Sequence, residues 1–162
     1  MYVDGVECTV LVAENPRDAA HPIAYTPIQY EFPPGERFKH EKLKWEDYEG
    51  MGCRPVEDAT LAARLREDCS RFFMQLGAAS FARCDVRVDR HGVPHMLEIN
   101  PNCGVYYPPA DYGSADLCLT HDPAGHAGFT RNLVEAAFAR HARATETPSR
   151  SMNSGGDSPE RP

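Results

Sequence analysis

The sequence predicts an α+β fold in which helices flank an antiparallel sheet. Residues 81–89 alternate between apolar and polar side chains, which is the period of a strand buried on one face. The turn at 89–92 leads into a returning strand at 93–99, so these two strands are expected to form a hairpin. Residues 58–76 carry apolar side chains at helical spacing, with an aspartate as N-cap and a glycine after the last turn. Together these segments predict the α+β class.

Further elements are expected before and after this helix and hairpin. Residues 2–13 predict a strand, and residues 23–32 predict a second strand that pairs back on it, with prolines placing part of it at an edge. The polar segment 38–48 is expected to be a loop beside the site. The stretch 105–128 is rich in proline, glycine and aspartate, and no helix or strand is assigned to it. An amphipathic helix is expected at about 130–142.

The chain length of 162 residues fits one domain with an ordinary hydrophobic core. This folded domain is expected to span residues 1–143. Residues 144–162 are dominated by serine, proline, glycine and charged residues, so they are expected to form a disordered tail.

The composition of the chain argues against nucleic acid and membranes as binding partners. The net charge of −7 and the absence of a basic stripe argue against nucleic acid. No apolar run approaches the roughly 20 residues of a membrane span, so a membrane partner is not expected either. The six cysteines lack the spacing of a zinc site and are interpreted as reduced thiols, which together with the lack of a leader segment predicts a cytoplasmic protein.

Two carboxylates and one amide gather on the predicted hairpin. Asp85 lies on the outgoing strand, Glu98 lies on the returning strand, and Asn100 follows on the same face as Glu98. Their oxygens are hard ligands, which suit Mg²⁺ (or Mn²⁺) bound partly through substrate phosphates better than they suit zinc. The hairpin therefore predicts a divalent-metal site. The alternative is that these are polar side chains on the exposed face of an edge hairpin.

The register of the hairpin depends on its turn. If the turn centres between residues 90 and 91, Arg83 falls opposite Glu98, and Asp85 lies one diagonal away on the same face. In this register His95 faces the opposite side, and it is interpreted as a packed core histidine.

The same residues resemble a known family. The hairpin carries an Arg-x-Asp motif that ends at Asp85 and a Glu-x-Asn motif that begins thirteen residues later, followed by a glycine four residues after the asparagine. This pattern resembles the metal-binding end of ATP-grasp ligases of the D-alanine–D-alanine ligase type. Residues 4–10 resemble the Gly-x-Glu-x-Thr-Val strand of that family. Residues 38–45 are similar to its segment ending in Lys-Tyr, with tryptophan in place of tyrosine. The resemblance covers roughly residues 2–140.

This resemblance implies roles on the hairpin. Asp85, Glu98 and Asn100 would be the Mg²⁺ ligands. Arg83 would steady the anionic transition state, and Gly104 would offer a backbone N–H there. Arg83 has a structural alternative as a salt-bridge partner that holds Glu98 in place.

Two further roles are implied upstream. Glu7 would hold the ribose of ATP, and Lys44 would contact the phosphates. The structural alternatives are an ordinary acidic residue on a strand for Glu7 and a solvated loop position for Lys44, which competes with Lys39 and Lys42.

By resemblance, the chain is the C-terminal lobe of an ATP-grasp fold. The implied activity is an ATP- and Mg²⁺-dependent ligase that joins a carboxylate to an amine through an acyl-phosphate, with an amino acid or peptide-like small molecule as substrate. The family usually follows Glu-x-Asn with Thr-x-Pro-Gly-Met-Thr and a later Ser-Leu pair. Here residues 101–107 read Pro-Asn-Cys-Gly-Val-Tyr-Tyr without that pair, so D-alanine itself is not indicated.

The chain is shorter than the ligases it resembles, which carry an N-terminal domain and a second lobe that clamps the nucleotide. We therefore expect an incomplete chain, either self-associating as a homo-oligomer or completed by an N-terminal half on another polypeptide. One alternative is a non-catalytic remnant that binds nucleotide or a protein partner. A second is an acidic domain whose hairpin carboxylates bind Ca²⁺ or nothing.

Overall fold

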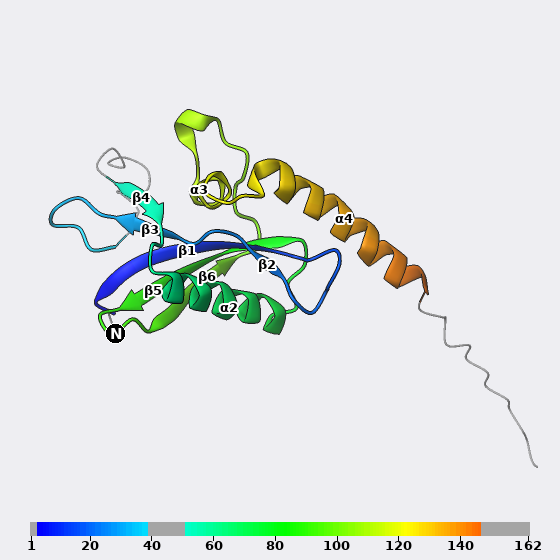
Figure 1. Cartoon of the computed structure of the whole chain (residues 1–162), viewed down its shortest axis with the longest axis horizontal. Coiled ribbons are helices and arrows are strands. Elements are labelled where there is room, and N and C mark those ends of the chain that lie inside the picture. The colour runs from blue at the N-terminus through cyan, green and yellow to red at the C-terminus, as the bar shows by residue number, and fades with distance from the viewer. Residues whose placement is uncertain (1–2, 39–50, 147–162) are drawn as a thin grey trace, which may run out of the picture.

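A computed structural model describes residues 3–38 and 51–146 (Figure 1). The strands form one antiparallel sheet in the order β4-β3-β1-β5-β6, and β2 pairs with β1 on the side away from β5. The strands are β1 (Gly5–Ala13), β2 (Ile23–Ala24), β3 (Ile28–Glu31), β4 (Gly52–Pro55), β5 (Phe81–Asp89) and β6 (Pro94–Asn100). The helices are α2 (Ala59–Gln75), the short 3₁₀ helix η2 (Pro109–Asp111), α3 (Ser114–Thr120) and α4 (Gly125–Glu146). The predicted architecture, an antiparallel sheet with flanking helices, is confirmed.

Helices cover both faces of the sheet, α2 on one side and α3 with α4 on the other (Figure 1). Side chains of each strand alternate between the faces, so two separate cores form. The core beneath α2 contains Cys8, Val10, Val12, Leu65, Cys69, Phe73, Ala82, Cys84, Val86 and Val88. The core beneath α3 and α4 contains Leu11, Ala13, Tyr25, Ile28, Cys103, Ala115, Cys118, Leu119 and Phe129.

Local hydrogen bonds define both ends of α2. At its start, the Asp58 carboxylate accepts hydrogen bonds from the backbone N–H of Thr60 (2.8 Å) and Leu61 (3.1 Å), which satisfies donors that the first helical turn leaves free. At its end, Gly77 has a φ of 61°, and the N–H groups of residues 77 and 78 bond back to the carbonyls of residues 74 and 73. This is a Schellman motif, which requires the left-handed conformation that glycine adopts easily. The predicted boundaries of this helix are confirmed.

The turn between β5 and β6 is longer than a two-residue turn. Residues 90–92 form the loop, and the N–H of Asp89 donates to the carbonyl of Val93 (3.0 Å). Gly92 closes the loop with a φ of 75°, as in three-residue hairpin loops. The Asp89 carboxylate accepts hydrogen bonds from the N–H groups of His91 (2.8 Å) and Val93 (2.9 Å). These bonds from a residue of the turn itself stabilise the turn.

The predicted register of the hairpin is wrong. Asp85 lies directly opposite Glu98, and Arg83 lies opposite Asn100. The three-residue loop shifts the pairing by one position, and a bulge at Leu97, between the pairs at residues 85 and 86, shifts it by one more. Asp85 and Glu98 are therefore closer neighbours than the diagonal arrangement expected from the sequence.

The bulge also changes which side chains of β6 share a face. Met96 and Ile99 both pack against the core beneath α2, although they are three positions apart, an odd spacing that would place them on opposite faces of a regular strand. His95 pairs with Arg87, lies on the same face as Glu98, and is exposed, with its imidazole 3.0 Å from the Asp89 carboxylate. Its interpretation as a packed core histidine is wrong.

Other elements differ from the expected ones in extent. The expected strand at 23–32 is divided into β2 and β3, and β4 and α3 were not expected at all. Helix α4 begins at Gly125 and continues through Glu146, past the expected domain boundary at residue 143, while residues 147–162 lie outside the described part. Among the helices within residues 3–38 and 51–146, none is long and apolar enough to cross a membrane.

The hairpin turn predicts an acid-sensitive contribution to stability. The hydrogen bond from His95 and those from two backbone N–H groups lower the pKa of Asp89 from 3.8 to about 2. Because the folded-state pKa is depressed, this stabilisation is present above pH 3.8 and is lost as the pH falls through about 2. A ¹³C NMR titration of the Asp89 carboxyl group should show the low midpoint, and His95→Gln should raise it. A midpoint near 3.8 in the wild type would contradict the proposed turn geometry.

Candidate functional site

Polar side chains from three neighbouring strands meet on the sheet face that carries α3 and α4. Cross-strand pairing arranges them in three rows across β1, β5 and β6. The rows are Glu7, Arg87 and His95; then Thr9, Asp85 and Glu98; then Leu11, Arg83 and Asn100. Leu11 belongs to the core beneath α3 and α4, so the helices cover one end of this surface. Asp85 occupies its centre.

Three hydrogen bonds hold the Asp85 carboxylate. The Arg83 guanidinium binds both oxygens, from Nε to Oδ1 (3.0 Å) and from Nη2 to Oδ2 (2.7 Å), and the Thr9 hydroxyl donates to Oδ1 (2.8 Å). The side chains of Arg83 and Asp85 are 17% and 15% exposed, so their interaction is only partly screened by water. Burial alone would lower the pKa of Arg83, but the charge and hydrogen bonds of Asp85 raise it above its usual value.

Glu98 and Asn100 complete the oxygen-rich part of the surface. The Glu98 side chain is 57% exposed, and its Oε1 lies 3.8 Å from Arg83 Nη2. The Asn100 side-chain oxygen accepts a hydrogen bond from the N–H of Asn102 (2.9 Å), which fixes the chain as it leaves β6. The structure thus brings together Asp85, Glu98, Asn100 and Arg83, as the sequence predicts, although in a different register.

These groups fit a hard divalent cation by donor type. Two carboxylates and an amide oxygen suit Mg²⁺ or Mn²⁺, and too few protein ligands are present to complete an octahedral shell without further oxygens. Within residues 3–38 and 51–146, no cluster of three or more His, Cys, Asp or Glu side chains suited to a metal ion occurs. The donor set therefore suits a cation that is shared with a phosphate-bearing ligand.

Glu7 lies beside a buried arginine that the sequence reasoning missed. Arg87 is 3% exposed, and its Nη1 lies 3.4 Å from the Glu7 carboxylate. The same guanidinium donates to the carbonyls of Val3 (3.1 Å) and Arg37 (2.6 Å). Arg87 thereby holds the segment before β1 and the segment after β3 against the sheet. The alternation along β5 was enough to place Arg87 on this face with Asp85.

Gly104 lies next to the Arg83 end of the site. Burial raises the pKa of the preceding Cys103 thiol, and the nearby Arg83 charge opposes that shift. The ring and hydroxyl of Tyr107 occupy the space that a side chain at Gly104 would need. Only a glycine is compatible with this position of Tyr107. Lys44, the expected phosphate contact, lies outside the described residues.

A buried carboxylate anchors the segment that follows Gly104. Asp116, with 0% exposure, accepts hydrogen bonds from the N–H groups of Tyr106 (2.7 Å) and Gly113 (3.2 Å) and contacts His126 Nε2 (2.8 Å). Tyr106 adopts a φ of 70°, an uncommon conformation for a non-glycine residue, and this network stabilises it. Asp116 belongs to α3. The sequence indicates this helix only through the helical spacing of the apolar residues Ala115, Cys118 and Leu119.

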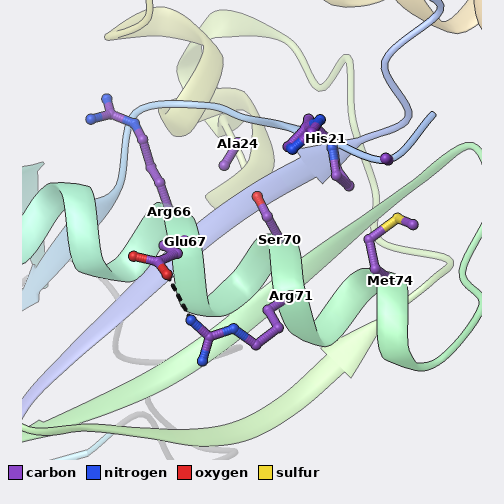
Figure 2. Close-up of a pocket in the computed structure, with 9 residues that line it drawn as sticks. His21, Ala24, Arg66, Glu67, Ser70, Arg71 and Met74 are labelled. Atoms are coloured by element: carbon purple, nitrogen blue, oxygen red, sulfur yellow. Dashed lines mark hydrogen bonds and ion pairs between the residues drawn. The ribbon is translucent and has the colours of Figure 1, made fainter. Parts of the chain in front are cut away.

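A separate groove lies beside α2 (Figure 2). Helix α2 packs on the sheet face opposite to the one that carries Asp85. The volume of the groove is about 550 Å³, and its walls come from β2, from the segment before β2 and from α2. The lining residues include His21, Ala24, Arg66, Ser70 and Met74. None of the expected site residues lines it.

Comparison with solved structures identifies the class of fold. The D-alanine–D-alanine ligase from Coxiella burnetii superposes with a TM-score of 0.57 at 15% identity, over 89% of this chain and 34% of the ligase. The D-alanine–D-alanine ligase from Bacillus anthracis complexed with ATP gives 0.59 at 17% identity, over 90% and 43%. The N5-carboxyaminoimidazole ribonucleotide synthetase from Thermotoga maritima gives 0.51 at 13% identity, over 83% and 30%.

These likenesses show a shared fold, that of the ATP-grasp ligases. More particularly, the neighbours include the D-alanine–D-alanine ligases that the hairpin motifs resemble, so this expectation is confirmed at the level of fold. The chain spans 34% and 43% of the length of the two D-alanine–D-alanine ligases. No protein-family model matches the chain, and no curated protein matches it in sequence.

The Asp116 anchor predicts a large loss of stability on substitution. Asp116→Asn replaces one acceptor oxygen with an amide donor that faces donors, so it should lower the free energy of unfolding by about 3 kcal/mol. Urea unfolding followed by circular dichroism measures this change. Asp111→Asn, at an exposed position of η2, is the matched control and should shift stability by less than about 0.5 kcal/mol. Equal effects of the two substitutions would contradict the assigned role of Asp116.

Proposed function

We propose that the chain forms the metal-binding and transition-state part of an ATP- and Mg²⁺-dependent ligase that joins a carboxylate to an amine through an acyl-phosphate. The observation that carries this proposal is the position of Asp85, directly opposite Glu98 and bound by Arg83 on the sheet face that carries α3 and α4. The fold shared with D-alanine–D-alanine ligases, one of them complexed with ATP, supports it. The proposed substrate is an amino acid or a peptide-like small molecule, and the proposed location is the cytoplasm.

Asp85, Glu98 and Asn100 would hold the cation together with oxygens of the nucleotide phosphates. The cation would supply charge neutralisation, which phosphoryl transfer requires more than it requires a covalent nucleophile. Glu98 is the exposed member of the set, so its carboxylate is free to turn toward a ligand. Asp85 is the fixed member, because its oxygens are held by three hydrogen bonds.

Arg83 and Gly104 would act on the anion that forms when the amine attacks. A guanidinium has five N–H donors, and two of those in Arg83 bind Asp85. The remaining donors are available to an oxyanion beside the Arg83 end of the site. The backbone N–H of Gly104 would add a neutral donor there, and the missing side chain lets Tyr107 pack over this backbone.

Glu7 would contact the ribose, and Lys44 would contact the phosphates. Arg87 supports the first role because its guanidinium holds the Glu7 carboxylate on the same sheet face as Asp85, where a carboxylate can accept hydrogen bonds from ribose hydroxyls. The opposing interpretation is that Glu7 only neutralises the buried Arg87. The two are distinguishable by experiment.

A second candidate function is nucleotide binding without turnover. It is favoured by the comparison in which the chain matches only 34% and 43% of the length of two ligases. Detectable Mg·ATP affinity without phosphate release over a panel of amino acids would identify it.

The metal site predicts a loss of Mg·ATP affinity on neutralising its carboxylates. Asp85→Asn combined with Glu98→Gln should weaken Mg·ATP binding in calorimetry about tenfold or more, because the amides cannot offset the cation charge. Asp68→Asn combined with Glu67→Gln, on α2 behind the sheet, removes the same two charges and should leave the affinity unchanged. Equal affinity of the double variant and the wild type would remove the basis for the metal site.

The ribose role of Glu7 predicts a nucleotide-dependent effect. Glu7→Gln should weaken ATP binding about tenfold, the equivalent of one hydrogen bond to a charged group. It should barely change the affinity for 2′,3′-dideoxy-ATP, which lacks the hydroxyls that Glu7 would bind. Calorimetry with both nucleotides tests this difference, and circular dichroism checks that the variant is folded. The same loss for both nucleotides would indicate that Glu7 acts only as the partner of Arg87.

A further inference from the structure

Thr9 is a fully buried polar residue in the middle of the candidate site. It is 0% exposed, and its hydroxyl lies 2.8 Å from Asp85 Oδ1 and 3.2 Å from the carbonyl oxygen of Cys84. A hydroxyl has one proton, so it cannot donate fully to both acceptors. The shorter distance and the charge of the carboxylate favour Asp85 as the acceptor.

The hydrogen bonds to Asp85 are divided unequally between its two oxygens. Oδ1 receives two donors, the Thr9 hydroxyl and Arg83 Nε. Oδ2 receives one, Arg83 Nη2. A carboxylate oxygen accepts about two hydrogen bonds, so among the contacts described for this part of the chain Oδ2 retains a free acceptor position and Oδ1 does not.

We propose that Thr9 is a positioning residue that fixes the Asp85 carboxylate so that Oδ2 faces the cation. This inference rests on the proposed metal and nucleotide function of the same site. Thr9 binds Oδ1 from the neighbouring strand β1, whose register with β5 places Thr9 directly opposite Asp85. Neighbours of this kind orient metal ligands, and their removal typically costs 10- to 100-fold in metal affinity.

Thr9 is suited to this role in a way that Arg83 is not. The guanidinium is positively charged and competes with a cation for Asp85, whereas the hydroxyl is neutral and does not. If a cation displaces Arg83 from Oδ2, the hydrogen bond from Thr9 to Oδ1 is not affected, because the two donors bind different oxygens. The carboxylate then keeps its orientation at the stage when the cation requires it.

The test compares isosteric and conservative variants of Thr9. Thr9→Val keeps the shape of the side chain and removes the hydroxyl, and Thr9→Ser restores the hydroxyl. Binding of Mn²⁺ is measured by electron paramagnetic resonance with a non-hydrolysable ATP analogue at saturation. We expect Thr9→Val to raise the Kd for Mn²⁺ at least tenfold and Thr9→Ser to raise it less than about threefold.

Val10→Ala is the control for loss of stability alone. Val10 is the next residue of β1 and lies in the core beneath α2, so its truncation should destabilise the fold without contacting the site. Urea unfolding is measured for all variants, and Val10→Ala should retain the wild-type Kd for Mn²⁺. Unchanged Mn²⁺ binding by Thr9→Val, or a loss that Thr9→Ser shares, would overturn the positioning role.

The same experiment distinguishes a failure of the proposed metal site from a failure of the role of Thr9. If the wild type binds no Mn²⁺ in the presence of the nucleotide analogue, the metal site and the role of Thr9 both fall. If the wild type binds and only the effect of Thr9→Val is absent, the metal site stands and the positioning role alone is overturned.

Discussion

The pairing of β1 with β5 sets the position of every other part of the sheet. Nine residue pairs join the two strands in continuous register, and each of the other strands attaches directly or through a neighbour to this pair. The pairing begins at Gly5, where any side chain would collide with the carbonyl of Val88. Because side chains alternate, the register that packs Val10 beneath α2 also places Thr9 beside Asp85. A slip by one residue would exchange core and site.

The sheet face that carries the site has an apolar, helix-covered part and a part lined by charged side chains. At the Leu11 end, α3 and α4 exclude water, and at the other end Arg87 is buried. Glu98, in the middle row, is exposed. A buried arginine is tolerated when each of its donors has a partner, and Arg87 binds one carboxylate and two carbonyls. Asp116 is satisfied in the same way by donors from the segment before α3 and from α4. These charges fix irregular segments that apolar contacts alone would leave poorly defined.

The sequence was sufficient for elements whose signals are local. The cap at Asp58 and the glycine at the end of α2 are chemical requirements of helix ends, and the prediction matched the structure there. It missed α3, because seven residues are too short for a clear helical period and the surrounding prolines and glycines suggested a loop. The strand β4 was missed because its four residues show no alternation between buried and exposed positions. Short elements of this kind are stabilised by tertiary contacts.

The candidate site was predictable in its residues more than in its geometry. Alternation along β5 placed Asp85 and Arg83 on one face, but the position of Glu98 relative to them depends on the three-residue loop and on the bulge at Leu97. A bulge has no strong sequence signal, because its cost depends on what both flanking faces must bury. Here it lets apolar side chains of β6 reach the core while Glu98 returns to the side of Asp85. The constraint that made the register hard to predict is therefore the one that brings the two carboxylates opposite each other.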